Sequence, residues 1–134
     1  MNQKKTIMII DDDIDLVEAM KITLEKNNFS VLSAYDPEEG LAKIKQSKVD
    51  LIILDVMFGS AGGTKGFDYA QKIKADKKLS SVPVLMITSI NEHYPNMNIG
   101  LETDSEFLPV DDFINKPAQP VELVKKINAL LKSK

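Results

Sequence analysis

Short apolar runs rich in β-branched residues alternate along this chain with segments of helical periodicity. Five runs have the length and composition of β-strands: 7–10, 29–34, 51–54, 82–88 and 112–115. The first, third and fourth runs are apolar at nearly every position, which is typical of strands covered on both faces of a sheet. Strands that alternate with helices predict βαβ units and therefore a parallel sheet.

The first two helical segments carry recognisable start signals. Asp13 is a candidate N-cap for the first, and Asp36 is one for the second, with Pro37 at the first helical position and two acidic residues after it. Apolar stripes define the inner faces, namely Val17, Met20 and Leu24 in the first helix and Leu41 and Ile44 in the second.

Two further helices are predicted over 67–77 and 121–131. The stripe of the last one consists of Val121, Val124, Ile127 and Leu131. Another helix is expected within 89–110 on topological grounds, although Pro95, Gly100 and Pro109 weaken its pattern.

Right-handed crossovers leave few topologies. The flavodoxin-like strand order 2-1-3-4-5 is one of the two common choices, and it brings the ends of the first and third strands together. We therefore predict an α/β fold, a flavodoxin-like (βα)5 three-layer sandwich around a five-stranded parallel sheet. A single domain over 5–131 is expected, with short tails at 1–4 and 132–134, because no boundary, repeat or low-complexity tract is visible.

Composition excludes several classes of function. The net charge of -3 and the pI near 5.2 argue against electrostatic binding of nucleic acid. The absence of cysteine excludes disulfides and thiolate metal sites. No apolar run approaches membrane-spanning length and no signal core follows Met1, so we expect a cytoplasmic protein that does not bind membranes.

Polar side chains follow four of the five predicted strands. Asp11 and Asp12 follow the first, Asp55 the third and Thr88 ends the fourth, while Lys116 follows the fifth. The strand order 2-1-3-4-5 brings these side chains to the carboxyl edge of the sheet, where open α/β sheets bind ligands.

Three carboxylates, a hydroxyl and an ammonium suit a divalent cation and a phosphoryl group. Mg²⁺ prefers oxygen ligands, and an aspartate can act as a nucleophile toward a phosphoryl donor. Each of these sequence features has a simpler interpretation when it is taken alone. An Asp-Asp-Asp run also forms turns and helix caps, a strand-final aspartate such as Asp55 often caps a helix, and Lys116 before Pro117 can be a solvated lysine.

The order and spacing of these residues resemble those of the receiver domain of two-component response regulators, a CheY-like family. The matching motifs are Ile-Ile-Asp-Asp-Asp at 9–13, Asp-Leu-Ile-Ile-Leu-Asp-Val-Met at 50–57, Val-Leu-Met-Ile-Thr-Ser at 84–89 and Asp-Asp-Phe-Ile-Asn-Lys-Pro at 111–117. Together they cover essentially the whole chain.

The resemblance implies a role for each matching residue. Asp55 is expected to be the phosphoacceptor, and Mg²⁺ is expected to be bound by Asp11, Asp12, Asp55 and the backbone carbonyl of Met57. Thr88 is the expected switch hydroxyl, Phe113 the rotating aromatic and Lys116 the counter-ion of the phosphoryl group. Phe113 could also be an ordinary core aromatic.

The function implied is a phosphorylation-dependent switch rather than an enzyme, beyond self-catalysed phosphorylation and dephosphorylation. The expected partners are a histidine kinase or phosphotransfer protein, and a downstream protein that binds the face formed by the helix within 89–110, the strand at 112–115 and the last helix. No DNA-binding region follows Leu131, so a stand-alone receiver and a receiver excised from a longer protein both stay open.

Two alternatives belong to other classes of function. A degenerate receiver would bind partners without phosphorylation, but all five chemical positions are present. A hydrolase with an aspartyl-phosphate intermediate, as in the haloacid dehalogenase-like phosphatases, needs a second acid two residues after the nucleophile, where this chain has Met57.

Two segments depart from the family pattern. Gly59 replaces a proline usual in receivers, and the glycine-rich loop 58–66 is longer than usual without the spacing of a P-loop. The interval from Thr88 to Lys116 is also long, and it contains His93, which we interpret as a solvated loop residue. The loop 58–66 is expected to alter access of the phosphodonor or of water to Asp55. The long interval bears on the output face more than on the phosphorylation chemistry.

Overall fold

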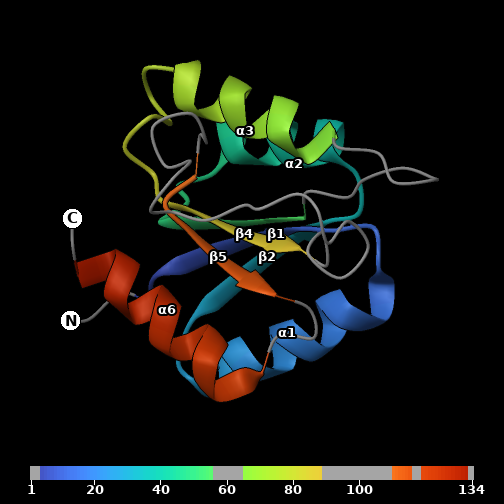
Figure 1. The fold of residues 1–134 in the computed structure, drawn as a ribbon, viewed down its shortest axis with the longest axis vertical. Helices are drawn as coiled ribbons and strands as arrows, with labels where there is room; N and C mark the ends of the chain where they lie inside the picture. The colour runs from blue at the N-terminus through green and yellow to red at the C-terminus, as the bar shows by residue number, and fades with distance from the viewer. Residues whose placement is uncertain (1–3, 56–64, 89–109, 116–118, 133–134) are drawn as a thin grey trace, which may run out of the picture.

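In the computed structural model, five parallel strands pair in the order β2-β1-β3-β4-β5 (Figure 1). The structure describes residues 4–55, 65–88, 110–115 and 119–132, without the side chains of 65–68 and 88. The strands are β1 (Thr6–Ile10), β2 (Ser30–Ala34), β3 (Leu51–Asp55), β4 (Val84–Thr88) and β5 (Asp112–Asn115). This order confirms the predicted flavodoxin-like sheet.

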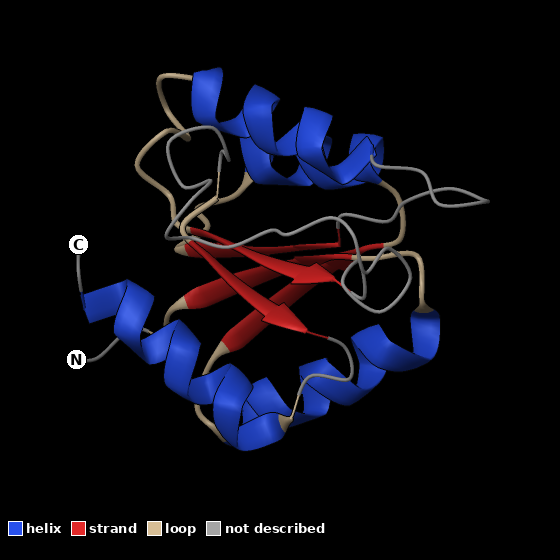
Figure 2. Cartoon of the chain, in the orientation of Figure 1, coloured by secondary structure: helices blue, strands red, loops and turns tan. Residues whose placement is uncertain are grey.

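Helices cover both faces of the sheet and form three layers. Figure 2 shows helices against both faces of the sheet. The helices are α1 (Ile14–Lys26), α2 (Pro37–Gln46), α3 (Lys65–Ala75) and α6 (Pro120–Lys132). The pair α1 and α6 packs on one face, and α2 and α3 pack on the other. The helix expected within 89–110 lies outside the described residues.

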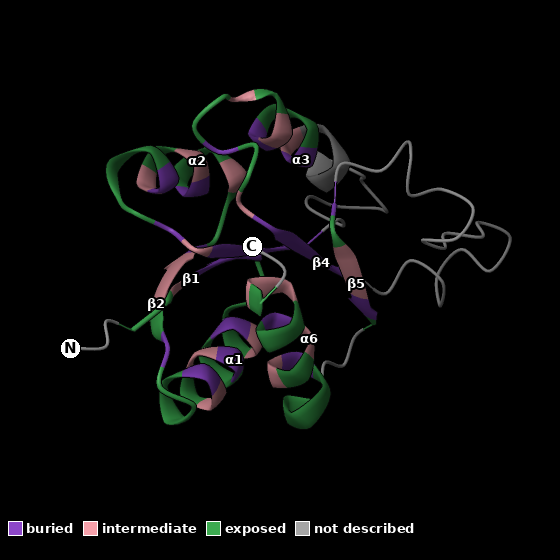
Figure 3. Cartoon of the chain, turned by 90° about the vertical axis from the view of Figure 1, so that its left-hand side faces the viewer, coloured by how far each residue is buried: buried purple, intermediate pink, exposed green. Residues whose placement is uncertain are grey.

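The central strands bury side chains on both faces, as their sequence predicts. In β1, Ile7 and Ile9 join the apolar core under α1 and α6, whereas Met8 and Ile10 join the core under α2 and α3. Every residue of β3 is buried. Figure 3 shows the same division on the helices, whose buried residues face the sheet. The sheet therefore has a separate apolar core on each of its two faces.

Local hydrogen bonds explain why two strands begin later than their apolar runs. Phe29 donates its amide to the carbonyl of Leu24 at 3.0 Å and so closes the C-terminus of α1, with Asn28 in the left-handed region at φ 72°. Val82 donates to Leu79 in a turn, and Pro83 has no amide to donate. Residues 29 and 82 consequently belong to the connections before β2 and β4 rather than to the strands.

One predicted stripe needs a correction. Val121 is 81% exposed, although it was expected on the inner face of the last helix. Leu123 and Ile127, which are one turn apart, are the buried residues of α6, and they direct Val121 away from the sheet. In α3 the helix also begins and ends two residues earlier than predicted. At its C-terminal end, Asp76 accepts the amide of Lys78 at 2.8 Å and starts a turn.

Two carboxylates fasten neighbouring strands at the amino edge of the sheet. Asp50 precedes β3 and accepts the amide of Thr6, the first residue of β1, at 2.8 Å. Asp111 precedes β5 and accepts the amide of Val84, the first residue of β4, at 2.7 Å. Each carboxylate therefore satisfies an amide at the start of the adjacent strand.

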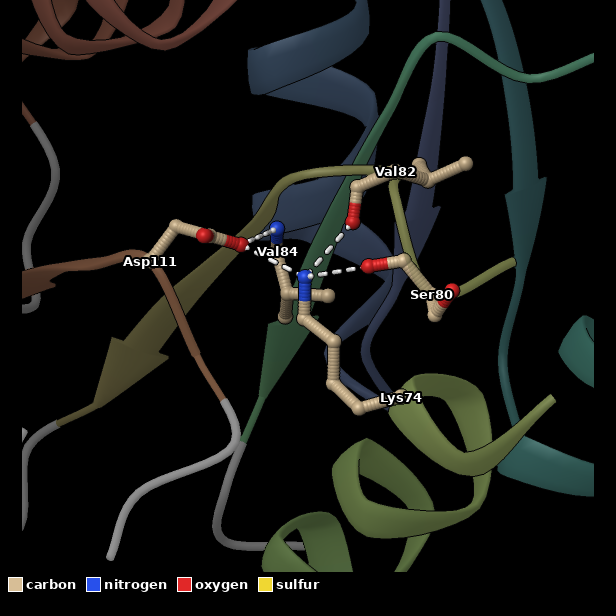
Figure 4. Close-up of polar contacts among 5 residues, drawn as sticks. All are labelled: Lys74, Ser80, Val82, Val84 and Asp111. Carbon is tan, nitrogen blue, oxygen red and sulfur yellow. Dashed lines mark hydrogen bonds and ion pairs between the residues drawn. The ribbon is translucent and has the colours of Figure 1, made fainter. Parts of the chain in front are cut away.

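Lys74 connects α3 to the second of these carboxylates. Its ammonium donates to Oδ2 of Asp111 at 2.8 Å, to the carbonyl of Val82 at 2.9 Å and to that of Ser80 at 3.5 Å (Figure 4). The ammonium thus joins a helix, the loop before β4 and the start of β5. The side chains of Lys74 and Asp111 are 22% and 33% exposed, so this ion pair is only partly screened by water.

We expect Lys74→Met to lower the free energy of unfolding by about 1–2 kcal/mol, because two carbonyls and one carboxylate lose a charged donor. Lys72→Met is the matched control, since the ammonium of Lys72 lies over the Tyr69 ring at 4.8 Å and that contact is worth less at an exposed site. Urea denaturation of both variants checks this. Equal losses for the two substitutions would contradict the role of the Lys74 contacts.

Gly40 allows α2 to approach β1 closely. A Cβ atom at this position would lie 2.6 Å from Cδ1 and 2.8 Å from Cγ1 of Ile10. Ile10 is itself buried between the sheet and the helix, so it has little room to move.

Gly40→Ala is expected to destabilise the fold by about 1 kcal/mol, because an overpacking cost of about 1–3 kcal/mol outweighs a gain in helix propensity of up to about 1 kcal/mol. Thermal denaturation of Gly40→Ala, Ile10→Val and the double variant checks this. The double variant should lose less stability than the sum of the single losses, since Ile10→Val removes Cδ1. Strict additivity would show that the close approach is not the cause.

Candidate functional site

Three carboxylates meet at the carboxyl edge of the two central strands. Asp11 and Asp12 directly follow β1, and Asp55 is the last residue of β3. Each offers one carboxylate oxygen, and these oxygens all lie within 4.8 Å of one another. The predicted meeting of these three side chains is confirmed as geometry, because β1 and β3 pair directly in the sheet.

Asp11 is held in place by its own backbone and by the turn that follows. Its amide donates to the carbonyl of Ala34 at 3.2 Å, and its Oδ1 accepts the amide of Asp13 at 2.9 Å. The residue is fully buried. Sequence reasoning did not find the contribution of Ala34, because that contact exists only once β2 pairs with β1 in the observed register.

Asp13 has a different task from its two neighbours. It is the N-cap of α1, and its Oδ1 accepts the amide of Leu16 at 3.1 Å. The two interpretations of the Asp-Asp-Asp run are therefore both realised. Asp13 is the helix cap, and Asp11 and Asp12 are directed to the carboxylate cluster.

The cluster combines two buried carboxylates with one exposed carboxylate. Asp55 is 1% exposed and Asp12 is exposed, so the group opens toward solvent on one side. Three carboxylates at this separation repel one another, and a bound cation relieves that repulsion. The oxygen-only donor set suits a hard cation such as Mg²⁺, which retains some of its water ligands.

The structure describes only some of the other predicted site residues. Thr88 ends β4 and pairs with Asn115 of β5, so its backbone reaches the same edge of the sheet. Phe113 pairs with Met86 and packs, partly buried, against the core under α2 and α3. Met57 and Lys116 lie outside the described residues, as do His93 and most of the two long loops.

A family model named response regulator receiver domain matches residues 7–128. The chain belongs to this family. Its members are signalling proteins of two-component systems, which agrees with the resemblance seen in the motifs.

Curated relatives of this receiver domain are about twice its length. It is 35% identical over 128 residues to the phosphate regulon transcriptional regulatory protein PhoB of Pseudomonas aeruginosa, with 96% of the chain and 52% of the relative covered. It is 33% identical over 132 residues to the alkaline phosphatase synthesis transcriptional regulatory protein PhoP of Bacillus subtilis, with 98% and 50% covered. The chain thus spans about half the length of these relatives.

Solved structures share the fold over almost the whole chain. A CheY-like receiver domain protein from Methanospirillum hungatei has a TM-score of 0.77 at 28% identity, with 98% of this chain and 96% of that chain covered. A two-component response regulator from Clostridium difficile has a TM-score of 0.77 at 28% identity, with 96% and 97% covered. Among the helices described for the receiver domain, none has the length and apolar character to cross a membrane.

We expect Asp12→Asn to raise the free energy of unfolding by up to about 1 kcal/mol in buffer with EDTA, because it removes one charge from the cluster. Added Mg²⁺ should then stabilise the wild type more than the variant, since a cation that binds only the folded state adds to its stability. Thermal denaturation with and without Mg²⁺ measures both effects.

Asp13→Asn is the matched control for this prediction. Asparagine is as good an N-cap as aspartate, and the Asp13 carboxylate is not part of the cluster. The two variants differ by one position and remove the same charge. If both variants were stabilised equally in EDTA, repulsion within the cluster would not be the cause.

Proposed function

We propose that this receiver domain, spanning 5–131, is a phosphorylation-dependent signalling switch whose phosphoacceptor is Asp55. The phosphoryl group would come from a histidine kinase or a phosphotransfer protein. The observation that carries the proposal is the meeting of Asp55 with Asp11 and Asp12, with oxygens within 4.8 Å, at the edge where β1 and β3 end. The membership of the chain in the receiver family supports the same assignment.

The residues of the cluster fit a Mg²⁺ ion. Asp11, Asp12, Asp55 and the backbone carbonyl of Met57 would hold it, and the ion would neutralise charge on the transferred phosphoryl group. Asp11 is positioned for this by the amide of Asp13, which fixes its carboxylate. Asp12 is exposed and so keeps one side of the site open to a phosphodonor.

Three further residues would convert phosphorylation into a change of surface. Lys116 would pair with the phosphoryl group, and the Thr88 hydroxyl would donate to it. Movement of Thr88 would make room for Phe113, which is partly buried against the core under α2 and α3. The roles of Thr88 and Phe113 are supported by the adjacency of β4 and β5.

The output would pass to a downstream protein through the face that contains β5, α6 and the segment 89–110. PhoB and PhoP are named as transcriptional regulators, and the chain covers about half of each. We propose no nucleic-acid contact for the receiver domain itself, because its net charge is -3. We also propose that it acts as a switch rather than as an enzyme on an external substrate.

The experiment is incubation of the chain with acetyl phosphate and Mg²⁺, followed by intact mass spectrometry. We expect the mass to rise by that of one phosphoryl group, because Asp55 forms an acyl phosphate. Asp55→Asn should abolish the adduct and EDTA should suppress it. Asp13→Asn should leave it intact, since this substitution preserves the cap and the cluster.

Two results would replace the proposal by another. Absence of an adduct with every small-molecule donor and with a phosphorylated phosphotransfer protein would indicate a receiver that acts without phosphorylation. Continuous hydrolysis of p-nitrophenyl phosphate, lost in Asp55→Asn, would indicate a hydrolase.

A further inference from the structure

A hollow bordered by lysines lies between the C-terminal ends of α2 and α3. Its volume is about 540 Å³, within the range of ligand sites in proteins. Val49 and Val82, which lie just before β3 and β4, form part of its lining. The hollow is therefore at the amino edge of the sheet, whereas the carboxylate cluster is at the carboxyl edge.

Positive charge dominates the border of the hollow. Four lysines line it: Lys45, Lys48, Lys77 and Lys78. The one acidic residue of the lining is Asp76, whose Oδ1 already accepts the amide of Lys78 at 2.8 Å. This concentration of lysine stands out on a chain whose net charge is -3.

The four ammonium groups have no carboxylate partner within the described part of the chain. Its ion pairs join Lys43 to Glu39, Lys74 to Asp111 and Lys126 to Asp112. Lys45, Lys48, Lys77 and Lys78 are all exposed and border one hollow. They are available to an anionic group from outside.

Helix dipoles do not account for this cluster. Lys45 lies in the last turn of α2 and interacts favourably with the dipole of that helix. Lys48, Lys77 and Lys78 lie beyond Gln46 and Ala75, where α2 and α3 end. The dipole effect falls off within the last turn of a helix, so it gives these three lysines little stabilisation.

The floor of the hollow is apolar, and two of its residues also line a second hollow. Ile44, Val49, Leu79 and Val82 contribute apolar side chains to the first one. The second hollow, of about 360 Å³, is lined by Val49 and Val82 together with Lys5, Asp50, Ser81, Pro83 and Leu131. Its one carboxylate, that of Asp50, already accepts the amide of Thr6. A ligand that reaches both hollows must be extended rather than compact.

The wall beside Val82 is held rigid by the contacts of Lys74. Its ammonium binds the carbonyls of Ser80 and Val82 and the carboxylate of Asp111, as Figure 4 shows. These contacts restrain the loop before β4. A site that is ordered in advance loses less entropy when it binds.

We propose that the two hollows form a docking site for an acidic peptide segment of a partner protein. Its carboxylates would pair with Lys48 and Lys78, and its apolar side chains would pack on Val49, Leu79 and Val82. A concave, elongated site suits a peptide better than the flat surface of a membrane. The proposal does not depend on phosphorylation of Asp55, because it concerns the opposite edge of the sheet.

The test uses the ¹⁵N-labelled full chain and a short synthetic peptide of alternating glutamate and leucine with blocked ends. We expect the peptide to shift the amide resonances of Val49, Leu79 and Val82, and to bind more weakly as salt is raised, because exposed charges are screened. Peptides with glutamine for glutamate or serine for leucine separate the contribution of charge from that of apolar contact. Both should bind more weakly.

Variants of the chain locate the site. Lys48→Glu/Lys78→Glu should raise the dissociation constant of the peptide by about tenfold or more, because two attractive contacts become repulsive. Lys26→Glu/Lys125→Glu, on the helices of the opposite layer, changes the net charge equally and should alter the dissociation constant by less than about twofold. Lys48→Arg/Lys78→Arg should retain binding.

Three results would overturn the proposal. The first is the absence of shifts at Val49, Leu79 and Val82, or shifts mapped to another surface. The second is equal weakening by the two charge-reversal variants, which would show that only net charge matters. The third is binding to phosphatidylglycerol vesicles, lost in Lys48→Glu/Lys78→Glu, without binding of the peptide, which would assign the surface to a membrane.

Discussion

Burial of the central strands on both faces is the constraint on which the rest of this structure depends. β1 and β3 send alternate side chains into two cores, and the side chains of Ile7–Ile10 and Leu51–Leu54 are all apolar. Polar residues at the strand ends help to set the register. Asp50 fastens the start of β1, Asp111 fastens the start of β4, and the amide of Asp11 extends the pairing of β1 with β2.

The same arrangement brings together groups that oppose folding. Parallel strands that start in register also end in register, so Asp11, Asp12 and Asp55 meet at one edge with like charges within 4.8 Å. The protein tolerates this because the surrounding sheet is fully packed and because the amide of Asp13 supports Asp11. Functional sites commonly contain locally unfavourable interactions, which favourable interactions elsewhere in the protein compensate.

The two edges of the sheet carry different groups of charged residues. The carboxyl edge presents the carboxylate cluster, which suits a cation and a phosphoryl group. The amino edge presents the lysine-bordered hollow beside the Lys74 contacts, which suits an anionic peptide. Helices α2 and α3 lie between the two edges and separate the carboxylate cluster from the hollow (Figure 1).

The sequence alone was enough to predict the fold class, the strand order and the meeting of three carboxylates at one edge of the sheet. Apolar periodicity and strand-end residues are local signals, and in a parallel sheet the strand ends lie at the same edge. It also identified Asp13 and Asp36 as helix caps, which depend only on neighbouring amides. Tertiary structure decided the rest. The exposure of Val121, the contact of Lys74 with Asp111 thirty-seven residues away, and the hollow between α2 and α3 all depend on how separate elements pack. No local sequence pattern encodes these three features, because they arise only when the helices pack against the sheet.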